Sequence, residues 1–353
     1  MNQNSKVWSI LCVILVLVML AIFSLSTAVI DPYFHYHAPL EQLTYPLHSQ
    51  RYQNDGIVKN FDYDALITGT SMTENFKTSE LDALFGVNSI KVSFSGAMLS
   101  ELANNLQRAL DHNSNLQLVI LCIDQWFFTD DLDLLQVEGS YPIYLYDDNL
   151  FNDVEYLLNR EIFWGSTLKV LNHTSKGLPT TSFDEYSSWD WGVPRSVANV
   201  LESYQRPEQH ELVALTEEDL TRLQTSLEYT LVKMARENPN VQFIIYFPPY
   251  SALSWDQAMR NGQFDRILGL YEFASQILLE EENIRLFSFS ADYETTGNLE
   301  NYLDFIHHSG EINSLLLQHF RSGEYQLTKE NYMDHWNEIR TFYENYDFSA
   351  LLG

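Results

Sequence analysis

Short apolar runs alternate with helical patterns along this 353-residue chain, and that alternation restricts the fold more than any other feature. Five runs are typical of buried strands: 65–68, 89–93, 116–123, 241–247 and 284–289. Helical patterns lie between them at about 79–85, 99–110 and 264–281, and one begins at Thr216, a typical N-cap residue. Strands connected through helices form parallel sheets covered on both faces. The pattern predicts an α/β domain of three layers, α/β/α, around a five-stranded parallel sheet.

The amino-terminal stretch 7–30 contains no charged residue. At about 1.5 Å per residue it can cross a hydrocarbon core about 30 Å thick. Lys6 precedes it and Asp31 follows it, which favours a cytoplasmic amino terminus (1–6). A cleaved signal peptide is the alternative, because Ser26 and Ala28 loosely fit a cleavage site, but the run exceeds the ~7–15 residues of a signal core. We expect one retained transmembrane anchor in the cell membrane and an extracytoplasmic body.

The composition restricts the partners of that body. The 20 Lys and Arg residues against 48 Asp and Glu give a net charge of −28, which argues strongly against nucleic acid and anionic lipid headgroups as partners and disfavours a bare phosphate polymer. The alternative is that this charge serves solubility alone. Cys12 lies in the apolar amino-terminal stretch and Cys122 in a predicted strand, so we do not expect the two to form a disulfide. The aromatic lead-in 31–60 begins with rings that include His35 and His37, for which we favour packing near the membrane interface over a metal site.

Two separated motifs carry the candidate chemistry. Ser71, in Gly69-Thr70-Ser71, follows the first predicted strand, where its hydroxyl would lie at the sheet rim among backbone N–H groups. Asp304 precedes His307 by three residues, so that in a turn the carboxylate can bind one ring nitrogen and leave the other for a serine. The motifs predict a nucleophile, a general base and its orienting carboxylate. The alternative for Ser71 is a helix-capping role.

Two rivals to this interpretation use the same carboxyl-terminal residues. His308 is a second imidazole beside the first, but no aspartate lies three residues before it. A metal site is the other rival, although its residues lack a recognised ligand spacing. Its candidate ligands would be Asp304, His307, His308, Asp334 and His335.

The two motifs, with Gly96 in Ser93-Phe94-Ser95-Gly96-Ala97, resemble the blocks of the SGNH/GDSL hydrolase superfamily over residues 64–320. The resemblance is greatest to membrane-anchored members that act on envelope polymers, such as D-alanyl transfer proteins of teichoic acid loci and alginate O-acetyltransferases. It implies a flavodoxin-like sheet, catalytic Ser71, His307 and Asp304, and an oxyanion hole at Ser71 and Gly96. It implies a domain spanning 61–353, no cofactor and no metal.

One block departs from the family. Where its oxyanion-hole asparagine is expected, this chain has Asp124, followed by Gln125 and Trp126. An ionised Asp124 would repel an oxyanion, which leaves three possibilities. Gln125 donates a hydrogen bond to the oxyanion in its place, Asp124 has another role, or the oxyanion hole has only backbone donors. Because Ser71, Gly96 and Asp124 all follow strands, they fall at the edge where sheets of this kind hold their sites.

An aromatic-rich stretch at about 134–215 interrupts the strand–helix rhythm, and we interpret it as an insertion over the strand ends. Its rings either stack on sugars or form a small core. Further cleft candidates are Asp124, Trp126, Tyr250, Ser251 and His308. The aromatic residues of the insertion are Tyr141, Tyr144, Tyr146, Trp164, Trp189 and Trp191.

The sequence therefore predicts an extracytoplasmic serine-dependent O-acyl esterase or O-acyltransferase. Its partners would be an acyl donor, an envelope glycan or polyol polymer, and a membrane-bound acyl-transfer protein. Hydrolysis and transfer stay open, because the first half-reaction is the same. The alternative is a catalytically inactive relative that binds glycan or scaffolds a surface-polymer machine, and the substitution at Asp124 is its main support.

Overall fold

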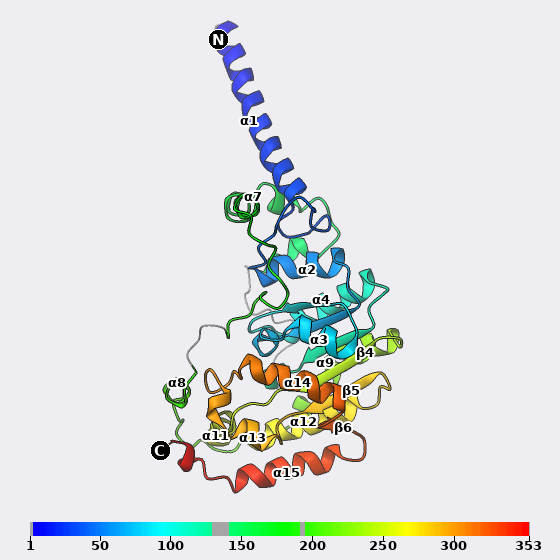
Figure 1. The fold of residues 1–353 in the computed structure, drawn as a ribbon, viewed down its shortest axis with the longest axis vertical. Coiled ribbons are helices and arrows are strands. Elements are labelled where there is room, and N and C mark those ends of the chain that lie inside the picture. Colours follow the sequence, from blue (N-terminus) through cyan, green and yellow to red (C-terminus); the bar gives the residue numbers. More distant parts are fainter. Residues whose placement is uncertain (1–2, 129–140, 191–194, 353) are drawn as a thin grey trace. The chain divides into compact units, whose positions relative to one another are not determined.

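The computed structural model describes residues 3–128, 141–190 and 195–352 (Figure 1). The chain divides into two compact units. The first is formed by Met1–Phe61 with Gly139–Ser182, and the second by Asp62–Glu138 with Phe183–Gly353. Part of the stretch that we interpreted as an insertion thus belongs with the amino-terminal residues.

One six-stranded sheet organises the second unit, in the order β2-β1-β3-β4-β5-β6. The first five strands are parallel, and β6 pairs antiparallel with β5. The α/β class is confirmed, but the five-stranded, all-parallel sheet is wrong. The reason is that β6 has only two residues, too few to show an alternating pattern. The strands are β1 (Ala65–Gly69), β2 (Ser89–Ser93), β3 (Leu118–Cys122), β4 (Gln242–Phe247), β5 (Ile284–Ser288) and β6 (Gln326–Leu327).

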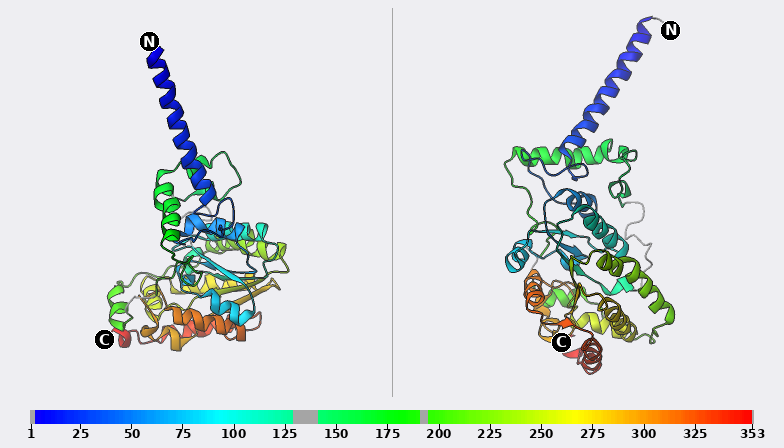
Figure 2. Two further views of the ribbon diagram at one scale, coloured as in Figure 1. Left: turned by 45° about the horizontal axis from the view of Figure 1, so that its top comes forward. Right: turned by 90° about the vertical axis from the view of Figure 1, so that its right-hand side faces the viewer.

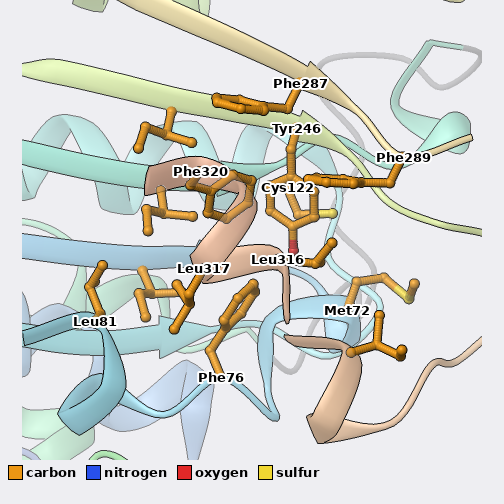
Figure 3. Packing of buried hydrophobic residues seen from close by; sticks show 14 of the residues in the cluster. Met72, Phe76, Leu81, Cys122, Tyr246, Phe287, Phe289, Leu316, Leu317 and Phe320 are labelled. Carbon is orange, nitrogen blue, oxygen red and sulfur yellow. The ribbon is translucent and has the colours of Figure 1, made fainter. Parts of the chain in front are cut away.

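Helices cover both faces of this sheet because alternate strand residues point to opposite sides and nearly all are buried. On one face α3 (Thr78–Phe85) and α14 (Gly310–Ser322) pack on the strands, and Figure 3 shows Leu316, Leu317 and Phe320 seated against Tyr246 and Phe287. On the other, α4 (Leu99–His112) packs on β1, and α12 (Phe264–Leu278) packs on β5 and against α9 (Glu217–Leu227) and α15 (Tyr332–Glu344).

The remaining elements of the second unit are short or connect the layers. Thr216 caps α9 as predicted, accepting from the Asp219 N–H at 3.1 Å in a capping box. The other elements are η1 (Ser71–Thr73), η2 (Gln125–Phe128), α8 (Val197–Ser203), η5 (Glu228–Val232), α10 (Lys233–Glu237), α11 (Ala252–Arg260), α13 (Tyr293–Thr296), η6 (Leu299–Asn301) and α16 (Ser349–Leu352).

The first unit is built on the end of a long apolar helix, α1 (Gln3–Ile30). Within 6–30 this helix contains an 18-residue window with a mean hydropathy of 2.9, and by length and composition it can be a membrane anchor or a signal sequence. Figure 2 shows α1 projecting from the other elements of its unit. Those elements are α2 (Gln50–Asn60), η3 (Ile143–Leu145), α5 (Val154–Leu157), α6 (Arg160–Ile162), η4 (Phe163–Thr167) and α7 (Leu168–Ser175).

The aromatic residues of this unit are largely packed together. Tyr141 and Tyr146 are buried, with ring centroids 4.7 Å apart, as a small core requires. Tyr144 is half-buried, whereas Trp164 is exposed. Trp191 lies outside the described residues. Of the two interpretations of these rings, packing therefore accounts for Tyr141 and Tyr146.

Candidate active site

Ser71 lies on a tight turn at the carboxyl end of β1. Gly69, the last residue of that strand, has φ 150°, and a Cβ there would lie 2.6 Å from the Thr73 side chain. Met72 is buried in the core between the sheet and α14 (Figure 3). Its carbonyl accepts from Asn313 Nδ2 at 3.0 Å. Because the next residue is fixed in the core, Ser71 is held at the rim and stays half-buried.

The candidate base comes from a turn that lies between η6 and α14. Tyr302 and His308 form an antiparallel bridge across this turn, and the Leu303 N–H donates to the His307 carbonyl at 2.9 Å. Asp304 Oδ1 accepts from the backbone N–H groups of Ile306 and His307 at 2.7 and 2.8 Å. The carboxylate thus shapes the turn that carries the imidazole, as Asp side chains often do.

The two motifs meet. Ser71 Oγ lies 2.9 Å from His307 Nε2, and His307 Nδ1 lies 2.7 Å from Asp304 Oδ2. Hydroxyl, imidazole and carboxylate therefore form one hydrogen-bonded series of the kind that activates a serine.

The charges in this series support one another. Burial opposes the imidazolium, but the acidic groups, Asp304 first with Asp124 and Glu74, together raise the pKa of His307 above its ordinary value. Burial likewise opposes the ionised Asp304, yet its bonds to His307 hold the pKa of that carboxyl below the ordinary range. Asp304 is thus an anion at neutral pH, and it stabilises the proton that His307 would take.

Asp124 occupies a buried position behind the serine turn. It is fully buried and accepts hydrogen bonds from the hydroxyls of Thr70 and Tyr250. Burial raises the pKa of this carboxyl to about 6, although both hydroxyls oppose that shift. Since Thr70 immediately precedes Ser71, the Asp124 carboxylate fixes the serine turn from inside. Of the three interpretations of Asp124, the contacts favour a role other than oxyanion donor.

The predicted oxyanion donors lie on two neighbouring strand ends. Gly96 follows β2, which pairs with β1 up to Gly69 and Ser93. Within the described residues, neither the Ser71 N–H nor the Gly96 N–H donates to a protein acceptor, so both can serve a ligand. Gln125 begins η2 and is half-buried, and Trp126 Nε1 donates to the Ala97 carbonyl at 3.4 Å.

The other cleft candidates are used internally. Tyr250 is buried on Asp124, and the buried Ser251 donates to the Phe305 carbonyl while capping α11. His308 is also buried, and its burial lowers the pKa of the ring to about 4, so it stays neutral. These contacts favour a structural role for Tyr250 and Ser251, and burial favours the same role for His308.

Trp189 is the residue beside the base that its sequence context did not indicate. Its ring lies edge-on to His307, with centroids 5.2 Å apart. Asn75 Oδ1 accepts from the Trp189 and Asp190 N–H groups at 3.0 and 3.2 Å, and Asp190 Oδ2 accepts from the Gly310 N–H at 2.7 Å. In the sequence, Trp189 was marked only by its position in an aromatic-rich stretch, and that position does not indicate which ring lies beside His307.

The metal alternative finds no support in the part of the chain that the structure describes, where no group of three or more His, Cys, Asp or Glu side chains is arranged to hold an ion. His35 Nε2 instead lies 3.2 Å from Asp153 Oδ1, and the partial burial of His335 lowers the pKa of its ring to about 4.

No protein-family model and no curated protein matches the chain. Among solved structures it is similar to a protein from Streptococcus pneumonia that is provisionally described as a platelet activating factor, with 12% identity and a TM-score of 0.41. That similarity covers 78% of this chain and 90% of the other. A likeness this weak carries no argument about activity, so the chemistry is inferred from the site itself.

Proposed function

We propose that this protein is a membrane-anchored, serine-dependent O-acyl ester enzyme of the SGNH type, an esterase or acyltransferase for envelope glycans or teichoic-acid-like polymers. The observation that carries the proposal is the continuous series from Ser71 Oγ through His307 to Asp304, at 2.9 and 2.7 Å. These residues come from turns 236 positions apart, so the arrangement does not follow from local structure.

The reaction uses each of these groups in turn. Ser71 Oγ attacks the acyl carbonyl carbon while His307 Nε2 takes its proton, and the N–H groups of Ser71 and Gly96 bind the oxyanion. The intermediate then expels the leaving alcohol, which receives the proton from His307, and an acyl-Ser71 ester remains. An acceptor hydroxyl next gives its proton to His307 and attacks that ester. The second intermediate then expels Ser71 Oγ, which takes the proton back from His307, and the acylated acceptor is released. Asp304 holds the imidazole throughout.

The proposed substrate is a neutral or zwitterionic glycan in preference to a bare phosphate polymer. The net charge of −28 would repel a polyanion unless cations bridge the two. Water as acceptor gives ester hydrolysis, and a glycan hydroxyl gives transfer. A membrane-bound donor of the acyl group fits a chain anchored at the same membrane.

For the anchor, we propose that α1 is retained, with the amino terminus in the cytoplasm. The last turn of α1 is packed into the first unit: Thr27 is fully buried, with its hydroxyl 3.2 Å from that of Thr167, and Tyr45 OH donates to the Ile30 carbonyl at 2.8 Å. Cleavage after Ala28 would remove Thr27 and its contact. This favours an anchor over a signal peptide.

The alternative, an inactive glycan-binding or scaffolding protein, rested on Asp124. Its carboxylate is engaged by Thr70 and Tyr250, which weakens that support. Labelling by a fluorophosphonate probe distinguishes the two functions. We expect the full chain to be labelled at neutral pH, and Ser71→Ala to lose labelling by about 10³-fold or more. Ser114→Ala, an exposed serine before β3, is the matched control and should label normally.

A chain that is folded but never labelled, or that labels equally after Ser71→Ala, would favour the binding protein. Hydrolysis and transfer are then separated by incubating the labelling-competent chain with a model acyl ester, with and without a neutral glycan. Acylated glycan identifies a transferase, and free acid that does not depend on glycan identifies an esterase.

A further inference from the structure

Outside α1, the first unit exposes a group of large apolar side chains on the segment 150–171, which runs through α5, α6 and η4 into α7. Phe151 is 94% exposed and Trp164 is 62% exposed. Exposed apolar groups of this size mark contacts with another protein or with a membrane. The members of this apolar segment are Leu150, Phe151, Val154, Leu158, Trp164 and Leu171.

The apolar segment is attached directly to the last two turns of α1. The rings of Phe23 and Phe163 are stacked with centroids 4.1 Å apart. One turn further along α1, the Thr27 hydroxyl meets Thr167, four residues after Phe163. Figure 2 shows the helices of this part, in green, crossing the base of α1 within the same unit. The exposed side chains are therefore continuous with the helix that we place in the membrane.

The position of Phe23 sets the depth of this contact. A span of about 20 residues crosses the hydrocarbon core, so an anchor that begins at Val7 reaches the far boundary near Ser26. Phe23 then lies roughly one helical turn, about 5 Å, inside that boundary. Phe163 stacks on it, and Trp164 is its neighbour, so both rings fall at the depth where aromatic side chains concentrate in membrane proteins.

The charges nearby indicate what kind of contact this is. Residues 147–176 contain five acids and three bases: Asp147, Asp148, Asp153, Glu155 and Glu161 against Arg160, Lys169 and Lys176. A lipid surface held by electrostatic attraction requires an excess of bases. The contact is therefore apolar insertion, as in interfacial helices that bury one face among acyl chains.

We propose that the segment 150–171 lies in the membrane interface beside α1, with Phe151 and Trp164 inserted among the acyl chains of a neutral lipid surface. The first unit is then held to the bilayer by two elements, one crossing it and one lying in it. This inference rests on the membrane anchoring in the proposed function and not on the ester chemistry.

The test places an environment-sensitive nitrobenzoxadiazole label on single thiols of the full chain, reconstituted at one copy per nanodisc of phosphatidylcholine. Cys12 is exposed on α1 and reports on the anchor, while Cys122 is buried, so we expect it not to react in the folded chain. In a Cys12→Ser background, Phe151→Cys reports on the interfacial segment. Met333→Cys, an isolated exposed apolar position on α15, is the matched control.

Lipids with brominated acyl chains should quench the fluorescence of the labels at Cys12 and at Phe151→Cys at least about twice as strongly as that of the label at Met333→Cys. The emission of the first two labels should also be shifted to the blue. Raising the salt to 1 M should leave the Phe151→Cys quenching unchanged. If Cys12 is quenched and Phe151→Cys behaves like Met333→Cys, the anchor stands and the interfacial segment is overturned, which would leave a second copy or another protein as occupant. If Cys12 is not quenched, the anchor fails and the inference fails with it.

Discussion

At the scale of single residues, the candidate site depends on which proton each ring or carboxyl holds. His307 can accept the Ser71 proton only when it is neutral, and Asp304 raises the pKa of that imidazole against the effect of burial. Its neighbour His308 is neutral at every physiological pH because burial lowers its pKa to about 4. The surroundings of these two adjacent histidines thus shift their pKa values in opposite directions.

This difference predicts a pH dependence. Activity should rise as His307 loses its proton, with a midpoint above the ordinary histidine pKa of about 6.5. Asp304→Asn should move that midpoint to lower pH, because it removes the group that raises the pKa, and should lower kcat/KM by about 10²-fold or more. The measurement is the pH profile of model-ester hydrolysis or of probe labelling. Asp334→Asn, an exposed carboxylate on α15, is the control, and an equal shift there would contradict the assignment.

Asp124 predicts a different pH effect, on stability. Its carboxyl has a pKa of about 6 in the folded chain against 3.8 ordinarily, so the folded chain binds more protons between those values. Stability contributed by this group is therefore present at low pH and lost as pH rises through about 6.

Asp124→Asn cannot ionise and should escape this loss. We compare the free energy of unfolding of the variant with that of the parent chain. The difference between them should shift in favour of the variant by up to about 3 kcal/mol as pH rises from about 4 to about 7.5. Urea unfolding in detergent at the two pH values measures the gain. A difference between variant and parent that does not change with pH would mean that the buried carboxyl does not titrate as inferred.

At the scale of elements, the turn between β1 and η1 joins the sheet to the site. It closes only because residue 69 lacks a side chain: a Cβ there would lie 2.6 Å from Thr73 Cγ2 and 2.9 Å from Cys122 Cβ, at a φ of 150°. β1 and β3 are adjacent strands, so the same close packing brings Asp124 under Thr70.

Gly69→Ala should therefore destabilise the second unit by about 2–4 kcal/mol and displace Ser71, so that probe labelling falls as well. Gly86→Ala is the matched control, because Gly86 also has a positive φ, 72°, but a Cβ there meets nothing within 4 Å. It should cost only the backbone strain, about 1 kcal/mol, and leave labelling intact. Equal effects from the two substitutions would argue that strain alone, and not the close contact, is responsible.

At the scale of the whole molecule, an apolar helix and a strongly acidic body set where the protein can work. The end of α1 is continuous with the first unit through Asp31, which is buried and accepts backbone N–H bonds from His35, Tyr36 and His37. This packing supports our proposal that α1 is retained and is not a removable leader.

We expect the mature protein to keep α1. It should stay in the membrane fraction after alkaline carbonate extraction, and its intact mass should include residues 1–30. The physical reason is that cleavage after Ala28 would remove Phe23 and Thr27 from the contacts with η4. A mature chain that begins at Val29, or one released by carbonate, would contradict the retained anchor.

The amino-acid sequence alone determined the α/β class, the approximate ends of strands β1 to β5 and the apolar character of α1, because these depend on local periodicity and composition. It also indicated Ser71 and Asp304 with His307 as separate motifs. It missed β6 because a two-residue edge strand leaves no pattern. It missed Trp189 as the neighbour of His307 because ring contacts depend on how distant loops pack.

Only the tertiary structure decided that Ser71 and His307 lie 2.9 Å apart, that Asp124 turns inward to two hydroxyls, and that the segment 150–171 attaches to α1. The physical reason is that each of these contacts joins positions more than fifty residues apart. Strand order and side-chain packing bring such positions together, and no local pattern records them.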